Sequence, residues 1–178
     1  MKPVGKPDAG NPHVRFDERG GETEPGCSQI EARIAALDER LVRQARDDEA
    51  CRRLTEAPGI GPVIATAMVA TVGNARLFSS GRSFAAWLGL TPRQHATGGK
   101  ERLLGISKRG DGYLRRQLMP GARSLVRLAH GRERHPWAWI NALRARRPFN
   151  VVVAAVANKL ARMIWAMLSR GEAYRAAA

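Results

Sequence analysis

The segment Pro58-Gly59-Ile60-Gly61-Pro62 constrains the fold more than any other, because it forces a tight turn between two helix-forming stretches. The stretch before it, 48–57, contains helix formers throughout, and the stretch after it, 63–72, is almost wholly apolar and is predicted to be buried. Pro58 ends the first helix, because the residue before a proline avoids helical backbone angles. Pro62 suits the first turn of the second helix, where its missing N–H costs nothing.

The two glycines of this turn predict a helix-hairpin-helix that grips a nucleic-acid backbone. Gly59 and Gly61 allow a tight bend and have no Cβ to block a close approach. Backbone N–H groups at the start of the second helix then face outward and form a cradle for a phosphate oxygen. We therefore predict that Gly59, Ile60 and Gly61 contact nucleic acid. The alternative is a plain helical corner that binds nothing.

The charge of the chain favours the nucleic-acid interpretation. The sequence has 30 Lys and Arg against 16 Asp and Glu, a formal net charge of +14, and a pI near 11.3, and nucleic acid is the commonest partner of such a domain. We expect no membrane partner, because we find no run of about 20 apolar residues. The polar start lacks the apolar region of a signal peptide. Cys27 and Cys51 have no metal-type spacing and are expected to be free thiols in the cytoplasm.

The first part of the chain predicts a disordered arm followed by a helix. Residues 1–27 are rich in proline and glycine, show no apolar periodicity and are interpreted as an unrelated N-terminal arm. Ser28 is predicted to cap the first helix in a capping box with Glu31. The leading helices, residues 28–57, carry an apolar stripe that either packs on the chain's own domain, the favoured interpretation, or forms a coiled-coil seam with a partner: Ile30, Ile34, Leu37 and Leu41.

The remainder, residues 58–174, predicts an all-α, helix-hairpin-helix-containing domain with one projecting loop. Residues 90–106 have a central Gly98-Gly99 and no helical stripe, so they are expected to form a glycine-rich loop or a short β-hairpin. Helices are predicted at 83–88, 111–130, 138–146 and 150–169, the last of them central to the core. Asp111 is the expected cap of the second of these helices, and Pro120 is expected to kink or break it. Its predicted inward residues are Leu114, Leu118, Leu125 and Leu128.

A basic stretch surrounds the projecting loop. From Thr91 to Arg116 there are seven Lys and Arg against two acids, a net +5, and arginine forks match phosphate oxygens in a bidentate way. His95 is a candidate base for a hydroxyl nucleophile at Thr97. No pair of acids predicts a two-metal site, and no cofactor is expected in this chain. The predicted nucleic-acid contacts here are Arg93, Lys100, Arg102, Lys108, Arg109 and Arg115.

These motifs indicate a resemblance to a known protein family. The run from Ala50 to Arg116, which includes PGIGP, HATGGK and SKRGDGYLRR, resembles the C-terminal domain of the DEDD insertion-sequence transposases. These form the insertion sequence 110 and 1111 group and are relatives of the Piv invertase. The tail from Trp139 to Tyr174 is similar to the end of the 1111-type branch.

The resemblance implies a composite reaction site. Family members carry a RuvC-like domain whose four acids bind divalent metal, magnesium, while the C-terminal domain supplies a serine nucleophile, and some members use a structured guide RNA. The family's His-Ser-Ser/Thr-Gly-Gly-Lys reads His95-Ala96-Thr97-Gly98-Gly99-Lys100 here. Ala96 therefore replaces the serine under the alignment that we favour, whereas Thr97 keeps a hydroxyl, with a stiffer χ1, under the other alignment.

We accordingly expect a truncated, bacterial transposase fragment without the RuvC-like domain. Its predicted function is DNA binding in DNA transposition and recombination, in the cytoplasm near the nucleoid, and the fragment is expected to be inactive alone. One alternative is an accessory subunit that works in trans with a full-length transposase or forms a homo-oligomer through the apolar stripe. A second alternative is a non-enzymatic RNA-binding domain.

Overall fold

The computed structural model describes residues 25–97, 100–132 and 136–175, with side chains placed within 28–96, 104–132 and 136–175. Residues 1–24 of the predicted arm lie outside these residues, and the assignment of 25–27 to that arm is wrong because they are helical. The described chain is mostly helical, which confirms the predicted class, and its one small sheet is the projecting β-hairpin. In chain order the elements are α1 (Pro25–Asp47), α2 (Glu49–Thr55), α3 (Pro62–Val72), a 3₁₀ turn η1 (Ala75–Leu77), α4 (Gly81–Trp87), β1 (Pro92–Thr97), β2 (Lys100–Ile106), α5 (Gly112–Leu128), α6 (Trp137–Arg144) and α7 (Phe149–Arg170).

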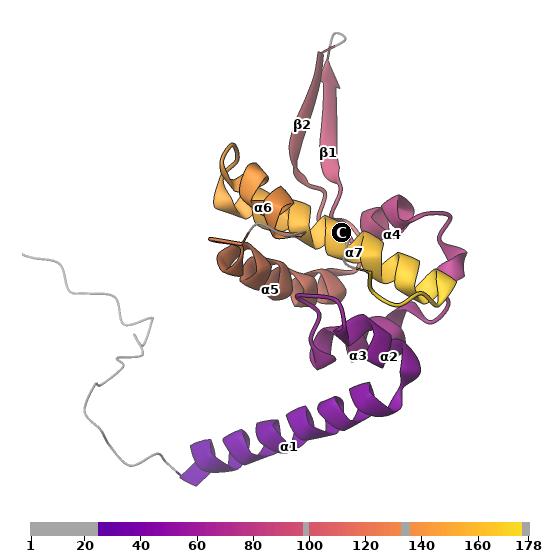
Figure 1. Cartoon of the computed structure of the whole chain (residues 1–178), viewed down its shortest axis with the longest axis vertical. Helices are drawn as coiled ribbons and strands as arrows, with labels where there is room; N and C mark the ends of the chain where they lie inside the picture. Colours follow the sequence, from indigo (N-terminus) through magenta and orange to yellow (C-terminus); the bar gives the residue numbers. More distant parts are fainter. Residues whose placement is uncertain (1–24, 98–99, 133–135, 176–178) are drawn as a thin grey trace, which may run out of the picture.

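Helix α7 is the centre of the core, as predicted. It packs against α2, α4, α5, α6 and η1 (Figure 1). An apolar face formed by every third or fourth residue explains this position, because it buries side chains on several neighbours at once. The buried residues of α7 are Val152, Val153, Val156, Ala157, Leu160, Ala161, Ile164 and Met167.

The expectation that no apolar stretch is long enough to cross a membrane is wrong for the same helix. Helix α7 has 22 residues and a mean hydropathy of 1.6 over its most apolar window, which is sufficient by length and composition. In this fold 44% of that window is buried inside the protein. A core helix passes the same test, and the packing of α7 on its neighbours is that of a core helix.

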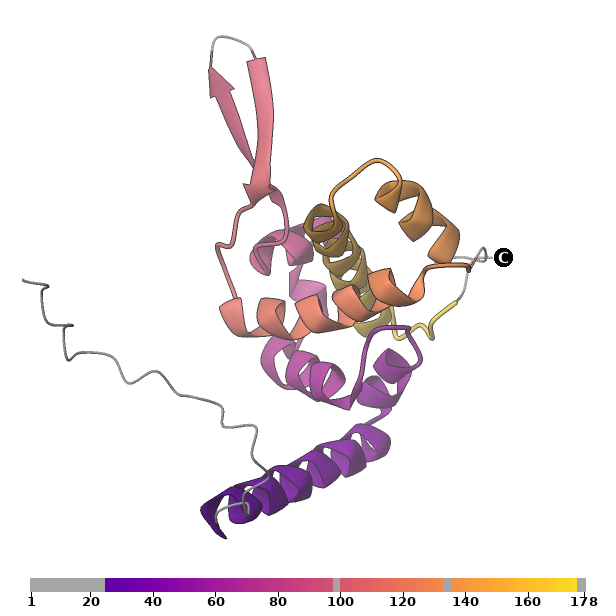
Figure 2. The same ribbon diagram turned by 90° about the vertical axis from the view of Figure 1, so that its left-hand side faces the viewer.

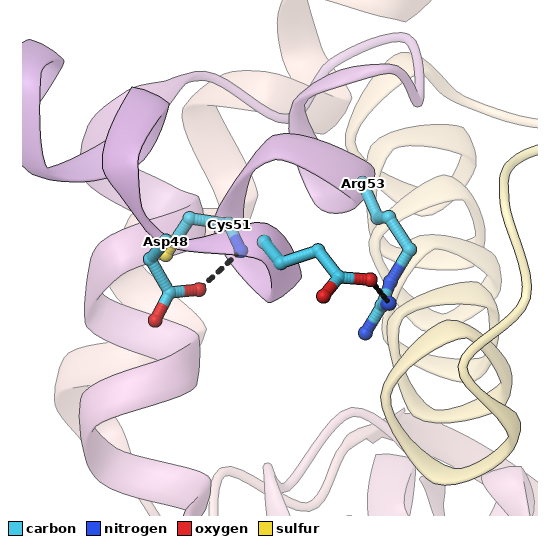
Figure 3. Close-up of polar contacts among 4 residues, drawn as sticks. Asp48, Cys51 and Arg53 are labelled. Atoms are coloured by element: carbon cyan, nitrogen blue, oxygen red, sulfur yellow. Dashed lines mark hydrogen bonds and ion pairs between the residues drawn. The ribbon is translucent and has the colours of Figure 1, made fainter.

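Side-chain caps fix where several helices begin. The Asp111 carboxylate accepts a hydrogen bond of 2.8 Å from the N–H of Leu114, which confirms the predicted cap of α5. The Asp48 carboxylate caps α2 in the same way through the N–H of Cys51, also at 2.8 Å (Figure 3). The predicted cap at Ser28 is wrong, because α1 already begins at Pro25.

Two expectations for α5 meet different outcomes. The helix continues through Pro120, so the expected break does not occur, while a kink there stays a prediction. Leu128 is 51% exposed, although Leu114, Leu118 and Leu125 are buried as predicted. The buried stripe of α5 continues through Val126 and Ala129, which are both 0% exposed, so Leu128 lies outside this stripe.

Cys51 is a buried structural thiol. Its side chain is 2% exposed in the core between α2 and its neighbours. Burial, the negative charge of Asp48 and a hydrogen bond with Asp48 raise the pKa of the thiol to about 11. Because the thiolate is the reactive form, Cys51 is chemically quiet at neutral pH.

Helix α1 extends away from the helical body (Figures 1 and 2). Ile30, Ile34 and Leu37 of its apolar stripe are 60%, 54% and 53% exposed. The favoured prediction that this stripe packs on its own domain is therefore wrong for these three residues, whereas the fourth, Leu41, is half-buried. Only the C-terminal part of α1 reaches the body, where Ala45 is buried and the helix contacts α2 and α3.

Strands β1 and β2 form an antiparallel ribbon that projects from the body at the end opposite to α1 (Figure 1). His95 pairs with Arg102, and Thr97 pairs with Lys100, so the connection is the two-residue Gly98-Gly99. The register shifts between Pro92 and Gln94. This outcome confirms the β-hairpin alternative for residues 90–106.

Candidate nucleic-acid interface

The net positive charge of this chain lies in the part that follows the turn between α2 and α3. Residues 58–171 contain 19 Lys and Arg against 3 Asp and Glu, a net +16. Residues 1–57 contain 10 Lys and Arg against 12 Asp and Glu, a net −2. The polyanion-binding surface is therefore expected on the elements from α3 to α7 rather than on α1 or α2.

The turn between α2 and α3 is held against α5 rather than fully presented to solvent. Gly59 has a φ of +84°, and a Cβ built on it would lie 2.7 Å from Leu125 Cδ1. A Cβ on Gly121 of α5 would lie 2.1 Å from the carbonyl oxygen of Gly59. The glycines at 59 and 121 therefore allow two backbones to touch, which is a packing role.

The predicted phosphate contact at Ile60 is corrected by its hydrogen bond. Ile60 is 4% exposed, and its N–H donates to the carbonyl of Ala57 at 3.1 Å. Gly61 differs, because it caps α3 without a side-chain acceptor and its Cα faces open space. A phosphate site at the N–H groups that follow Gly61 stays a prediction.

The turn and the basic residues that follow the ribbon do not form one surface. At 3.6 residues per turn, Gly121 and Leu125 lie about 140° and 180° around α5 from Arg116, whereas Arg123 lies within about 20° of it. The turn packs on the first pair. The arginines at 116 and 123 are exposed on the opposite side of the helix.

The base of the ribbon is a rigid backbone clamp. The segment after β2 returns along the end of α4, where the N–H of Lys108 donates to Gly89 O at 3.0 Å and the N–H of Asp111 donates to Trp87 O at 3.1 Å. A Cβ on Gly110 would lie 1.8 Å from Trp87 O. Lys108 itself has a φ of +56°, a conformation that few residues other than glycine adopt. These contacts fix the backbone of Lys108 beside the start of α5.

Arg115 is partly a structural residue. Its Nη1 donates to the carbonyl of Leu88 at 2.9 Å and to that of Asp111 at 3.4 Å. The guanidinium therefore satisfies carbonyls at the end of α4 and holds α5 against the clamp. A guanidinium has five N–H donors, so Arg115 keeps donors for a ligand while its position is fixed.

These elements enclose a groove of about 460 Å³, which we call the cationic groove. Its charged lining is Lys108, Arg115, Arg116 and Arg123, and no carboxylate among the described side chains lines it. None of these four residues forms an ion pair within the described side chains. Unpaired, convergent cations are the arrangement that attracts phosphate.

The other predicted site residues are placed on or near the ribbon. Arg93 is exposed on β1, and Arg109 is exposed in the clamp beside Lys108. The side chains of Lys100, Arg102 and Thr97 lie outside the described part of the structure. Lys100 and Arg102 belong to β2, and Thr97 is the last residue of β1.

The candidate reaction residues share one strand. His95 and Ala96 are both exposed on β1. Successive side chains of a strand alternate between its faces, so His95 and Ala96 lie on opposite faces of the ribbon. Roles for His95 and Thr97 in catalysis stay predictions.

The described residues do not fit the divalent metal that the family implies. Magnesium needs a set of oxygen ligands that includes carboxylates. No group of three or more His, Cys, Asp or Glu that could hold a metal lies within the searched residues. Asp48 and Asp111 instead cap helices, and Glu49 pairs with Arg53 at 2.6 Å. We therefore propose no metal-dependent reaction step on these residues.

Arg123 is a groove cation that the sequence did not predict as a contact, and Arg116 was counted only in the net charge of the basic stretch. Both lie on α5, outside the glycine-rich loop. The signal was present in the sequence, because residues 112–171 carry 12 Lys and Arg against 1 acid. The seven-residue spacing between Arg116 and Arg123 also places them on one face of a helix.

Comparison with known proteins agrees with the resemblance. A family model described as Transposase IS116/IS110/IS902 family matches residues 51–137, which include the whole cationic groove. The chain is 51% identical over 146 residues to a probable family 20 transposase of Pseudomonas aeruginosa, with 82% of this chain and 43% of that protein covered.

Two further relatives are also transposases. The chain is 45% identical over 150 residues to a putative transposase of Sinorhizobium fredii, with 84% of this chain and 39% of that protein covered. It is 43% identical over 145 residues to the transposase for insertion sequence element IS1111A of Coxiella burnetii, with 82% of this chain and 40% of that protein covered. The chain thus spans about two fifths of the length of these relatives. By sequence, it belongs to the IS116/IS110/IS902 family of insertion-sequence transposases.

Proposed function

We propose that this chain is a DNA-binding part of an insertion-sequence transposase and that it holds phosphates in the cationic groove. The observation that carries the proposal is the convergence of four cations in the groove, without a carboxylate among its described side chains. Phosphate contacts of this kind position a protein on nucleic acid without reading its sequence. The relatives are bacterial transposases, and such an activity places the chain in the cytoplasm with the bacterial DNA.

We propose binding rather than strand cleavage as the activity of this chain alone. Ala96 has no hydroxyl, and under the alignment that we favour it replaces the serine nucleophile that the family resemblance implies. Thr97 is the remaining hydroxyl beside it. The relatives extend well beyond the matched region, so we assign transposition to a whole transposase and DNA binding to this part.

The salt dependence of binding tests the proposal. With fluorescently labelled duplex DNA, we expect the logarithm of the affinity to fall linearly with the logarithm of the salt concentration, with a slope of about −2.7 to −3.6 for three or four neutralised phosphates. Fluorescence anisotropy over 0.05–0.3 M salt measures this slope. An affinity that does not change over this range contradicts the proposal. Competition with a structured RNA separates the alternative, because an RNA-binding domain would release the DNA.

A second candidate function, subunit contact with a full-length transposase, rests on helix α1. Ile30, Ile34 and Leu37 are each more than half exposed on a helix that leaves the body (Figure 1). Their spacing of four and three residues is that of a coiled-coil seam. We propose that this stripe packs against the equivalent helix of a full-length transposase, so that the chain acts as an accessory subunit.

Substitution of one stripe residue tests this candidate. A charge in place of Ile34 is expected to abolish co-purification with the full-length transposase, because it puts a carboxylate into the apolar seam. The variant is Ile34→Glu, and size-exclusion chromatography of the mixed chains measures the complex. Arg33→Glu, one position away and off the stripe, is the matched control. Equal complex formation by the wild type and by Ile34→Glu argues against the seam.

A further inference from the structure

Three of the residues that line the cationic groove are apolar, and we call them its floor. Ile106 at the end of β2 and Met119 on α5 are half-buried there, and Pro120 is exposed. Phosphate binding alone does not require such a floor. An apolar surface that is left open next to four cations points to a ligand with both an anionic and an apolar part.

The charges of the groove are set at a spacing that suits a strand. Arg116 and Arg123 are two helical turns apart on α5, which corresponds to about 10 Å along the axis. Lys108 is fixed by the backbone clamp, and Arg115 is fixed by its hydrogen bonds to Leu88 and Asp111. The backbone of Lys108 and the guanidinium of Arg115 are therefore preset, which lowers the cost of ordering these two residues on binding.

From this geometry we infer that the cationic groove binds an unpaired DNA strand, with phosphates on the cations and one base against Met119 and Pro120. The inference rests on the proposed function and names the form of DNA that the groove takes. In an intact duplex the base faces are stacked and covered, so only phosphates and sugars reach such a site. An unpaired base exposes its aromatic face, and the thioether of methionine packs favourably on aromatic rings.

The alternative occupant, a duplex backbone held by phosphates alone, leaves the floor uncovered. Arg93, Arg109 and other exposed cations outside the groove serve that mode equally well, because they need no apolar neighbour. The groove differs from them in combining fixed charge with an apolar floor. That combination favours the single strand.

Three probes of equal length test the inference: single-stranded DNA, the matching duplex, and a strand in which the central nucleotides are abasic. The abasic strand has the same phosphates and lacks the bases there, so the difference isolates the floor. We expect the wild-type chain to bind the single strand about tenfold more tightly than the abasic strand, within the range of one base contact. Fluorescence anisotropy at fixed salt measures all three affinities.

Substitution of Met119 assigns the effect to the groove. Met119→Ala is expected to weaken single-strand binding about fivefold and to leave abasic and duplex binding unchanged, because only the base contact is removed. Met163→Ala on α7 is the matched control, since Met163 is also half-buried but lies outside the groove lining. Circular dichroism checks that both variants remain folded.

The outcomes separate this inference from the proposed function. Failure of every probe to bind overturns the proposed function. Equal binding of the single strand and the abasic strand, with a clear salt slope, overturns only the inference. Equal weakening of all three probes by Met119→Ala also overturns it. Tighter binding of an RNA strand of the same sequence overturns the assignment to DNA.

Discussion

Replacement of Gly121 by alanine is expected to lower the melting temperature of the chain by about 10 °C. A Cβ at this position would lie 2.1 Å from the carbonyl oxygen of Gly59 and 3.1 Å from Ile64 Cδ1. The oxygen belongs to a turn fixed between α2 and α3, so α5 must move away from that turn. Overpacking of this kind costs roughly 3 kcal/mol, and each kcal/mol shifts the melting temperature of a domain of this size by about 2–4 °C.

The sign of this effect distinguishes tertiary packing from helix propensity. Gly121 lies inside α5, where alanine is intrinsically better than glycine by about 1 kcal/mol. Propensity alone therefore predicts a more stable protein. Gly61→Ala is the matched control, because its Cβ would meet open space and its φ of −93° suits any residue. Thermal unfolding followed by circular dichroism measures both variants, and a stable Gly121→Ala variant would show that the turn does not pack on α5.

Local rules recovered most helices of this fold from the sequence. Prolines and glycines at 58–62 placed the turn, and Asp111 placed the start of α5, because caps and turns depend on residues within a few positions. The apolar pattern of 150–169 located the central helix within one residue of each end of α7. The Gly98-Gly99 pair located the ribbon between β1 and β2.

The failures concern which surface packs on which. The stripe of α1 has a clear helical period, yet period alone does not say whether its own domain or a partner covers it, and the structure leaves Ile34 exposed. The role of Gly59 depends on Gly121, 62 positions later in the chain. A contact at that separation leaves no local pattern, so the sequence predicted the turn and could not predict that α5 covers it.

For the same reason, the sequence predicted only part of the candidate site. Lys108 and Arg115 were recognisable because they follow a glycine-rich loop in a basic stretch. Arg123 becomes a neighbour of Lys108 only when the clamp at Trp87 and Gly89 brings the end of β2 to the start of α5. The apolar floor was also invisible, because Met119 reads as an ordinary helical residue until its exposed surroundings are known.

Removal of three groove charges is expected to weaken DNA binding about 100-fold at 0.05 M salt. The variant is Lys108→Asn, Arg116→Gln and Arg123→Gln, and each substitution deletes one charged partner of a phosphate, which is worth roughly 1 kcal/mol or about fivefold in affinity. Asparagine suits position 108 because it tolerates the φ of +56° there. Arg115 is kept, because its hydrogen bonds to Leu88 and Asp111 support the fold.

The salt slope identifies the cause of this loss. Three fewer phosphate contacts should make the slope of the logarithmic plot shallower by about 2.7, so the variant and the wild type should converge at high salt. The control carries the same change of net charge on α1, as Arg33→Gln, Arg40→Gln and Arg46→Gln, all at exposed positions. If the control loses as much affinity as the groove variant, binding follows net charge alone, and the cationic groove is not where the phosphates are held.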